Sequence, residues 1–348
     1  MLPARVESLP RSSILCLQTP MDALSEALTA VHMTGAIFYY AECSSPWGFA
    51  VPALDRVAHM LAPGTERLVP YHLVSEGTAL LKFDTLELEL EAGDVLIIPH
   101  GDAHEVSNGS PNVLIDSAAS LGKFLAGELR TMRLGGGGAK TCFVCGYFGC
   151  ERSADRLFLA GLPQVIKVNM RGDSTGQWLE SSIRYLVSEA DDRRPGQGVL
   201  LSKMAEALFV QTLRRYMESL PAEQTGWLAA ARDPIVGAAL AAMHANPGAG
   251  WTQDELARCV ATSKSVLGKR FETFLHEPPL TYLTRWRLQL AARALQTSRK
   301  HVGAIASEVG YTSQAAFNRA FKREFGMPPV QYRRSSSDAG PRVSNRRC

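Results

Sequence analysis

The length of the chain allows two domains, and its composition is that of a globular protein. It has 348 residues, of which 46% are hydrophobic and 20% are charged, and domains usually contain about 100 to 150 residues. No apolar run approaches the length of a membrane span, and the N-terminus has no signal-peptide core, which argues against a membrane-spanning protein. Seven cysteines without an evident disulfide framework favour a reducing cytoplasm.

The net charge of +3 conceals a division along the chain. Residues 251–348 contain 17 Lys and Arg against 7 Asp and Glu, whereas residues 1–250 contain 20 against 27. A basic C-terminal third on an acidic body indicates a nucleic-acid-binding module joined to a domain of another kind.

Short strands fill the N-terminal half. After an irregular lead-in over residues 1–20, a helix is expected over residues 22–31. Strands are expected over 36–41, 56–61, 69–75, 78–83, 86–90, 95–98 and 104–107. Pro and Gly breaks separate many of these runs, and this pattern predicts a β-sandwich or barrel. We place that domain at residues 21–170.

One stretch of this half resembles the second motif of cupin barrels at every fixed position. It reads Gly93-(x)5-Pro99-x-Gly101-x-x-His104-(x)3-Asn108. The first cupin motif supplies His-x-His and a Glu as metal ligands, but here its neighbourhood holds one histidine, His72. A metal ion in this domain is therefore one interpretation of His72 and His104, and a pair of hydrogen-bonded barrel histidines is the other. The incomplete set argues against a metalloenzyme, since catalytic sites use about three protein ligands.

A helix is expected over Ser117–Arg133, where leucines recur every fourth residue. The following run Gly135–Gly138 should be a flexible joint. It lacks the Gly-Lys-Ser/Thr ending of a phosphate-binding loop, so we expect no nucleotide site there.

A cysteine cluster comes next, with Cys142, Cys145 and Cys150 inside nine residues. One interpretation is a zinc or redox-sensing site, completed by His104. The other is a buried β-strand, because a free cysteine packs as a small hydrophobe. A lone CxxC is weak evidence for zinc, and the sequence has no second pair.

Two amphipathic helices are expected after the cysteines. Apolar stripes run from Trp178 to Ala190 and from Leu201 to Tyr216. These helices would pack on the barrel or on a second subunit, and the sequence does not separate the two alternatives. Residues 171–226 are therefore expected to form a helical linker with a possible role in dimerisation.

The C-terminal region contains one pattern twice. Leu256-Ala257-x-x-Val260, Ser263, Leu267, Phe271 and Tyr282 recur as Ile305-Ala306-x-x-Val309, Ser313, Phe317, Phe321 and Tyr332. Thr252 and Glu255 have the spacing of a capping box, and Ser263 and Ser313 suit helix N-caps. Each copy thus predicts two short helices across a tight turn, which is the helix-turn-helix arrangement. A long helix over 280–297 should separate the copies.

The second helix of each copy presents a polar face. The outward positions are Ser265, Gly268, Lys269 and Glu272 in the first copy and Ala315, Asn318, Arg319 and Lys322 in the second. Arg and Lys suit guanine, and Asn suits adenine. The residues expected to contact double-stranded DNA are Ser265, Lys269, Arg270, Gln314, Ala315, Asn318, Arg319 and Lys322. Because the second copy offers more base-reading side chains, we expect the first to anchor more than it reads. The alternative is an ordinary solvated helix face.

Residues 233–334 resemble the DNA-binding domain of the AraC/XylS transcription regulators. The second copy carries the signature Ile305-Ala306-x-x-Val309-Gly310-Tyr311-x-Ser313-x-x-x-Phe317-x-Arg319-x-Phe321-Lys322-x-x-Phe325-Gly326-x-x-Pro329-x-x-Tyr332-Arg333. The N-terminal region is similar to the cupin-type sensor domain of one AraC subfamily, through His72-x-x-x-Glu76-Gly77, Gly93-Asp94, Pro99-x-Gly101-x-x-His104 and Val144-Cys145-Gly146. The resemblance implies a bacterial, cytoplasmic and nucleoid-associated regulator that works with RNA polymerase. One departure is Ala261-Thr262 in place of the Gly-Tyr pair.

The expected fold class is α+β. A cupin-like antiparallel β-barrel followed by helices would precede an all-α domain at residues 227–334 with two helix-turn-helix units, and residues 335–348 would form a disordered tail. The expected function is sequence-specific transcription regulation, for instance as an activator and possibly as a homodimer, with a barrel that senses a small molecule or a redox state. The candidate effector, metal or redox residues are His72, His104, Cys142, Cys145 and Cys150. A cupin metalloenzyme fused to a DNA-binding module is the alternative, but we expect no enzyme activity.

Overall fold

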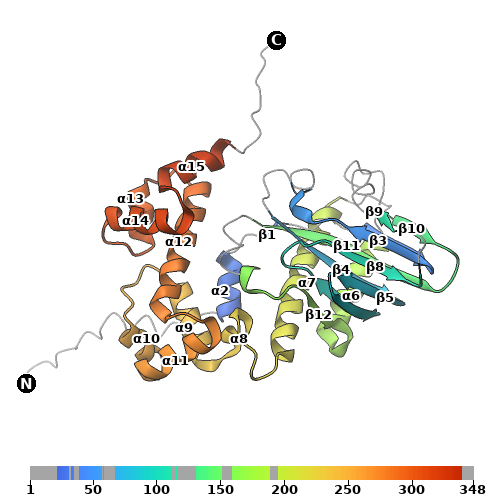
Figure 1. The fold of residues 1–348 in the computed structure, drawn as a ribbon, viewed down its shortest axis with the longest axis horizontal. Coiled ribbons are helices and arrows are strands. Elements are labelled where there is room, and N and C mark those ends of the chain that lie inside the picture. Colours follow the sequence, from blue (N-terminus) through green and yellow to red (C-terminus); the bar gives the residue numbers. More distant parts are fainter. Residues whose placement is uncertain are drawn as a thin grey trace, which may run out of the picture. The chain divides into compact units, whose positions relative to one another are not determined.

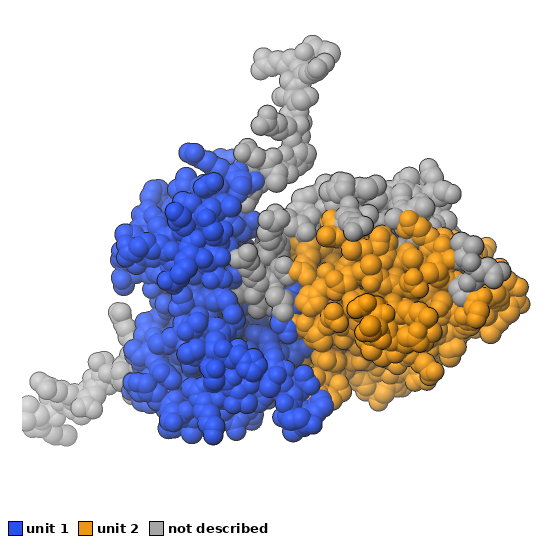
Figure 2. All heavy atoms as spheres, in the orientation of Figure 1, with its two compact units in different colours: residues 1–31, 156–161, 221–348 blue, residues 32–155, 162–220 orange. Residues whose placement is uncertain are grey.

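The computed structural model describes residues 22–30, 33–34, 39–56, 58, 67–110, 114–116, 131–150, 159–188 and 195–338. These residues form two compact units, which Figure 1 shows as ribbons and Figure 2 as coloured spheres. The barrel unit contains the described residues from 32 to 155 and from 162 to 220, and the helical unit contains those before 32, from 156 to 161 and after 220. Among the described residues, no helix is long and apolar enough to cross a membrane.

Two β-sheets form the barrel unit. The larger sheet has the strand order β10-β2-β11-β4-β7-β12, with β1 paired to β11, and the smaller has the order β6-β5-β8-β3-β9. The strands of the larger sheet are β1 (Met33–Thr34), β2 (Tyr39–Ser44), β4 (Arg67–Glu76), β7 (Asp94–Ile97), β10 (Thr131–Gly135), β11 (Lys140–Cys150) and β12 (Ile166–Asn169). Those of the smaller sheet are β3 (Trp47–Val51), β5 (Thr78–Phe83), β6 (Leu86–Glu91), β8 (His104–Asn108) and β9 (Ile115–Asp116). Most neighbours are antiparallel, but β10 runs parallel to β2 and β9 runs parallel to β3.

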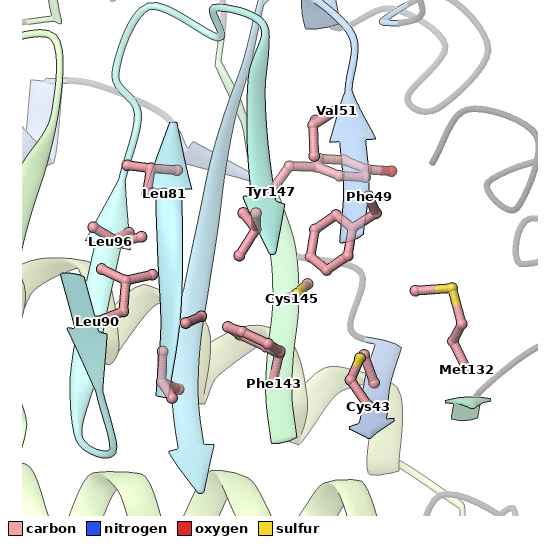
Figure 3. Close-up of a cluster of buried hydrophobic side chains, with 14 of the residues drawn as sticks. Cys43, Phe49, Val51, Leu81, Leu90, Leu96, Met132, Phe143, Cys145 and Tyr147 are labelled. Carbon is pink, nitrogen blue, oxygen red and sulfur yellow. The ribbon is translucent and has the colours of Figure 1, made fainter. Parts of the chain in front are cut away.

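Apolar side chains from both sheets form one core. Trp47 and Phe49 of β3 lie against Phe143 of β11, with ring centroids 5.3 Å and 6.1 Å apart. Leu81 and Leu96 are fully buried in the same cluster, part of which is drawn in Figure 3. Because alternate residues of a strand point to the same face, Phe143, Cys145 and Tyr147 of β11 all enter this core.

Most of the expected strands are confirmed, and β5 agrees with the expectation at both ends. The strands β3 and β12 were not expected. Arg56, expected in a strand, lies in a 3-10 helix, and apart from Ala58 the rest of 56–61 lies outside the described residues. The helix expected over Ser117–Arg133 is wrong at its described end, because residues 131–133 pair with β2 as part of β10. Residues 117–130 lie outside the described part of the chain.

The glycine run after β10 is a hydrogen-bonded turn rather than a flexible joint. It carries the chain around the end of β2, since β10 and β11 flank that strand. The amides of Gly136 and Gly138 donate to the carbonyls of Ser44 and Ser45, at 2.9 Å and 2.8 Å. Gly135 has φ +125°, and a Cβ atom there would stand 1.8 Å from the Ser44 carbonyl oxygen. Only glycine therefore fits this close approach.

Two helices complete the barrel unit, α6 (Ser174–Ser188) and α7 (Gln197–Ser219). The stripe of α7 packs on the unit's own larger sheet, where Phe209 lies against Phe148 of β11 with centroids 4.9 Å apart. Leu179 and Ile183 of α6 are buried, but Trp178, which begins the expected apolar stripe, is 59% exposed. Arg171 holds α6 through two hydrogen bonds to the buried carboxylate of Glu180.

The helical unit contains nine described α-helices. They are α2 (Ala23–Ala30), α8 (Trp227–Arg232), α9 (Pro234–Ala245), α10 (Gln253–Cys259), α11 (Lys264–Leu275), α12 (Pro279–Thr297), α13 (Val302–Glu308), α14 (Gln314–Phe325) and α15 (Pro329–Asp338). The sequence signals for helix starts are confirmed. Thr252 and Glu255 form the capping box of α10, and Ser263 and Ser313 cap α11 and α14.

The helix α2 packs with helices of the C-terminal region although it precedes the barrel in sequence. Its inner face, Ala23, Leu24 and Ala27, is almost completely buried against α9 and α8. Helix α9 is apolar and buried on nearly every side, as is typical of a helix with neighbours all around it. The helical unit therefore includes residues that the sequence assigns to the barrel domain, which was expected to begin at residue 21.

Candidate DNA-binding surface and buried histidine–thiol chain

Two helix-turn-helix units stand on either side of the long helix α12. In the first, α10 and α11 are joined by a turn in which the Thr262 amide donates to the Ala257 carbonyl at 2.9 Å. In the second, α13 and α14 are joined by the equivalent bond from Tyr311 to Ala306, also at 2.9 Å. Gly310 has φ +89° in its turn, and Ala261 adopts φ +51° at the matching place. The turn geometry is thus the same, although the first copy lacks the Gly-Tyr pair.

The first recognition helix, α11, leaves only part of its expected face free. Ser265 and Lys269 are exposed. The guanidinium of Arg270 forms an ion pair with Asp233, the N-cap of α9. Gly268 is half-buried, and a Cβ atom there would stand 3.0 Å from Nε2 of Gln253. Residues at these two positions therefore face the supporting helices rather than open solvent.

The second recognition helix, α14, presents a larger free surface. Four of its expected contact residues, Gln314, Ala315, Arg319 and Lys322, are exposed. Asn318 is half-buried, and its Oδ1 is buried with no hydrogen-bond partner among the described residues. Its position matches that of Gly268, so both lie toward the first helix of their unit.

Sequence reasoning overlooked Arg323 of α14. It is exposed, and it forms no ion pair with any described residue. Its spacing of four residues from Arg319 was the available signal, because such residues share one face of a helix.

Two arginines of α12 have structural partners within the helical unit. Arg287 donates to the backbone carbonyls of Pro247 and Ala249, each at 2.6 Å. Arg285 forms an ion pair with Glu277 in the loop before α12. These side chains therefore tie the first unit to the central helix.

A chain of hydrogen bonds crosses the interior of the barrel unit. Nδ1 of His72 lies 3.0 Å from Sγ of Cys145, and Nε2 of His72 lies 2.9 Å from Nε2 of His104. Nδ1 of His104 lies 2.9 Å from the carbonyl of Asp102. All three side chains are at most 4% exposed. The fold thus brings together three predicted site residues from β4, β8 and β11.

Each hydrogen in this chain can be assigned from its neighbour. Burial lowers the pKa of His104 to about 4 and that of His72 well below its usual value, so both rings are neutral near pH 7. The Asp102 carbonyl can only accept, so Nδ1 of His104 donates and its Nε2 is bare. His72 then donates through Nε2, and its bare Nδ1 accepts the thiol hydrogen of Cys145. All three hydrogen bonds therefore donate in one direction, from Cys145 toward the carbonyl of Asp102.

This arrangement does not fit a metal ion held by the two histidines. Metal sites in proteins usually have three or four protein ligands, but only two nitrogens, Nε2 of His72 and Nε2 of His104, face each other here. Cys145 lies at the opposite nitrogen of the His72 ring. No group of three or more His, Cys, Asp or Glu in the described part of the chain could hold a metal ion.

The three cysteines of β11 do not meet. Cys145 points into the core, whereas Cys142 lies beside Glu76, with Sγ 3.6 Å from its carboxylate. Burial raises the pKa of the Cys142 thiol. Cys150 is buried eight residues further along the strand, which is about 26 Å away at the rise of a β-strand. The three cysteines lie in a largely buried strand, as one interpretation of the cluster expected, and none of the three forms a disulfide bond.

Comparison with known proteins gives a consistent result for both units. The Cupin family matches residues 22–218, and the Helix-turn-helix domain family matches residues 256–335. The chain is 32% identical to the HTH-type transcriptional regulator AlkR of Acinetobacter baylyi, over 91% of this chain and 100% of that protein. It is 32% identical to an AraC-like transcription regulator of Streptomyces lividans, over 77% of this chain and 87% of the relative.

The chain belongs to the AraC-like family of helix-turn-helix transcriptional regulators. A further member is the RCS-specific HTH-type transcriptional activator RclR of Escherichia coli, 28% identical over 92% of this chain and 100% of that protein. As an AraC-like regulator, the chain combines a cupin-like ligand-sensing domain with a DNA-binding domain. The two recognition helices described above are therefore the candidate surface for DNA, and the buried chain of hydrogen bonds is the candidate sensor.

Proposed function

We propose that this regulator controls promoter occupancy according to the chemical state of the chain formed by Cys145, His72 and His104. What supports the proposal is a complete hydrogen-bond chain inside an apolar core. Buried polar groups cost free energy unless each has a partner. A change at one member therefore leaves the next one unsatisfied.

Oxidation of Cys145 is the input that we propose. A hydroperoxide would transfer one oxygen atom to the sulfur, so the thiol becomes a sulfenic acid and the hydroperoxide is reduced to an alcohol. The Sγ atom is only 3.0 Å from Nδ1 of His72, which leaves no room for an oxygen atom between them. The ring of His72 would have to move. A small molecule that binds His72 is the alternative input, and it would break the same chain.

We propose that the link between β11 and α2 carries this change to the DNA-binding helices. Strand β11 runs from Cys145 to Cys150, which pairs with Met33 of β1. Two residues separate Met33 from Ala30, the last residue of α2. We propose that a shift of β11 acts on α2, which packs against α9, through this short covalent connection.

The partners we propose are promoter DNA, RNA polymerase and a second copy of the chain, in the bacterial cytoplasm. Exposed apolar residues on α6 and in the first turn of α7, including Trp178 and Val199, support dimerisation through α6 and that first turn. We propose that the protein has no enzyme activity. Relatives over the full length are transcriptional regulators, and the histidine pair does not have the geometry of a catalytic metal site.

The experiment compares reduced and oxidised protein. An operator is first selected from random duplexes with the full chain, and genome-wide mapping with and without oxidant identifies the promoters. Affinity for the operator is then measured before and after hydrogen peroxide treatment in the wild type, Cys145→Ala and the control Cys150→Ala. We expect the response to be lost only in Cys145→Ala. A normal response in that variant would reject the sensor while leaving DNA binding intact.

A further inference from the structure

The two recognition helices carry different charges at equivalent positions. Fifty residues separate each pair of equivalents, as Ser263 and Ser313 or Phe271 and Phe321 show. The outward face of α11 presents Lys269, Glu272 and Thr273, and the same three positions of α14 hold Arg319, Lys322 and Arg323. All six side chains are exposed. One carboxylate therefore stands where the second helix has a lysine, and one hydroxyl stands where it has an arginine.

The remaining cations of α11 increase this difference. Lys264 pairs with Asp254 at 3.4 Å, and Arg270 pairs with Asp233. The equivalents of these two residues are Gln314 and Ala320, which carry no charge. Lys269 is therefore the cation of α11 that remains without an ion-pair partner among the described residues, and Glu272 lies within one turn of it.

The segments of the chain around the two recognition helices differ in charge in the same direction as the helices themselves. Residues 226–277 contain five Lys and Arg against five Asp and Glu. Residues 298–338 contain seven against three. Cations that neutralise phosphates supply the sequence-independent part of DNA affinity and its salt dependence. That part must come mainly from the second half of the helical unit.

We propose that α14 is the phosphate anchor of this regulator, which means that it makes most of the contacts to DNA phosphates. We also propose that Glu272 lets α11 bind stably only where its side chains meet matching bases. A carboxylate on the DNA-facing side is repelled by phosphates of any sequence. The first unit therefore stays on DNA only where Ser265 and Lys269 find matching bases, so Glu272 raises sequence discrimination while lowering affinity. This assignment reverses the expectation that the first copy anchors more than it reads. It rests on DNA binding by the helix-turn-helix units, but not on the proposed sensor.

Reciprocal charge exchanges test this assignment. The full chain is measured on a duplex of random sequence and on its selected operator, from about 50 to about 200 mM salt. Glu272→Lys gives the first helix the charge of the second, and Lys322→Glu does the opposite. Two exposed residues of α7, Glu218 and Arg214, supply controls with the same charge changes, Glu218→Lys and Arg214→Glu.

The two exchanges should change DNA affinity and its salt slope in opposite directions. Glu272→Lys should bind the random duplex several-fold more tightly and steepen the salt slope by about 0.9 for the new phosphate contact. Its ratio of operator to random affinity should fall. Lys322→Glu should weaken binding to both duplexes by at least tenfold and flatten the slope. Circular dichroism should be unchanged, because both positions are exposed.

The controls separate local charge from net charge. Glu218→Lys and Arg214→Glu should stay within about twofold of the wild type. If Glu272→Lys bound random DNA no more tightly than Glu218→Lys, or kept the full operator preference, the role of Glu272 would be refuted. Equal losses in Lys322→Glu and Arg214→Glu would refute the anchor. A wild type that bound neither duplex would overturn DNA binding itself, and this assignment with it.

Discussion

Arg287 in the middle of α12 donates a 2.6 Å hydrogen bond from Nε to the backbone carbonyl of Pro247. A second bond, from Nη2 to Ala249, is equally short. The guanidinium also lies next to Gly310, in the turn of the other helix-turn-helix unit. One side chain thus contacts the loop that leads into the first unit and the turn of the second.

The first prediction follows from these contacts. Arg287→Ala removes two charge-assisted hydrogen bonds and leaves two carbonyls without partners, so it should lower the free energy of unfolding of the helical unit by about 2–3 kcal/mol. Chemical denaturation followed by tryptophan fluorescence measures this loss. Arg319→Ala is the control, because that side chain is exposed, and its effect on stability should stay within about 0.5 kcal/mol. Equal stability of the two variants would show that Arg287 has no bracing role.

A second prediction concerns two glycines with positive φ. A Cβ atom on Gly310 would stand 3.0 Å from Cζ of Arg287 and from the Gly248 carbonyl oxygen, whereas a Cβ on Gly326 meets nothing within 4 Å. Both Gly→Ala changes should cost about 1–2 kcal/mol for the left-handed conformation. Gly310→Ala should cost at least about 1 kcal/mol more, because Arg287 must also move. Thermal denaturation of the two variants in parallel measures the difference. A lower stability of Gly326→Ala than of Gly310→Ala would contradict the prediction.

The third prediction tests the docking of α2. Ala27 is 1% exposed in that helix and packs with α9 and α8, so Ala27→Arg should undock it. The uncovered face of α9 should then exchange its amide hydrogens at least tenfold faster, as read by mass spectrometry. Thr29→Arg places the same charge on the exposed side of α2 and should leave the exchange of α9 unchanged. Unaltered exchange in Ala27→Arg would mean that α2 does not support α9.

The fourth prediction concerns pH. Burial lowers the pKa of His104 to about 4, while the unfolded chain titrates near the ordinary value of about 6.5. Between these values the unfolded state binds more protons, so the stability of the barrel unit is complete above pH 6.5 and falls toward pH 4. The loss should approach about 3 kcal/mol. Urea denaturation at several pH values measures it, and His104→Gln should show a shallower decline.

The fifth prediction distinguishes reading from anchoring on α14. Arg319 is exposed near the middle of this recognition helix, so Arg319→Ala should relax the preference at one operator position by about 1–3 kcal/mol. Competition binding against operators changed at single positions measures this. Equal losses on operator and random duplexes would assign Arg319 to phosphate contact instead.

Local sequence signals were the reliable part of the prediction. The capping box of Thr252 and Glu255 and the serine caps of α11 and α14 were confirmed, because each depends on residues at most three positions apart. The strand β5 was correct at both ends because alternation of burial repeats within the strand itself. The helix expected over Ser117–Arg133 failed at residues 131–133, where pairing with β2 outweighs the spacing of leucines.

For the candidate sites, too, the sequence did not predict contacts between residues far apart in the chain. Sequence alone named His72, His104 and Cys145, but not that they form one chain. It also placed Arg270 among the DNA contacts, although its guanidinium pairs with Asp233, 37 residues earlier. Such partners depend on how elements far apart in the sequence pack together, and the periodicity of the sequence does not predict them.

The amino-acid sequence by itself determined that this protein has a β-rich sensor and two copies of a helix-turn-helix unit. Those features arise from short-range periodicity, caps and an internal repeat. Only the tertiary structure decided that α2 packs with the DNA-binding helices, that three buried polar residues form a directed chain, and that α14 keeps its outward cations free. Each depends on contacts between residues far apart in sequence, whose partners are selected by the packing of complete helices and sheets.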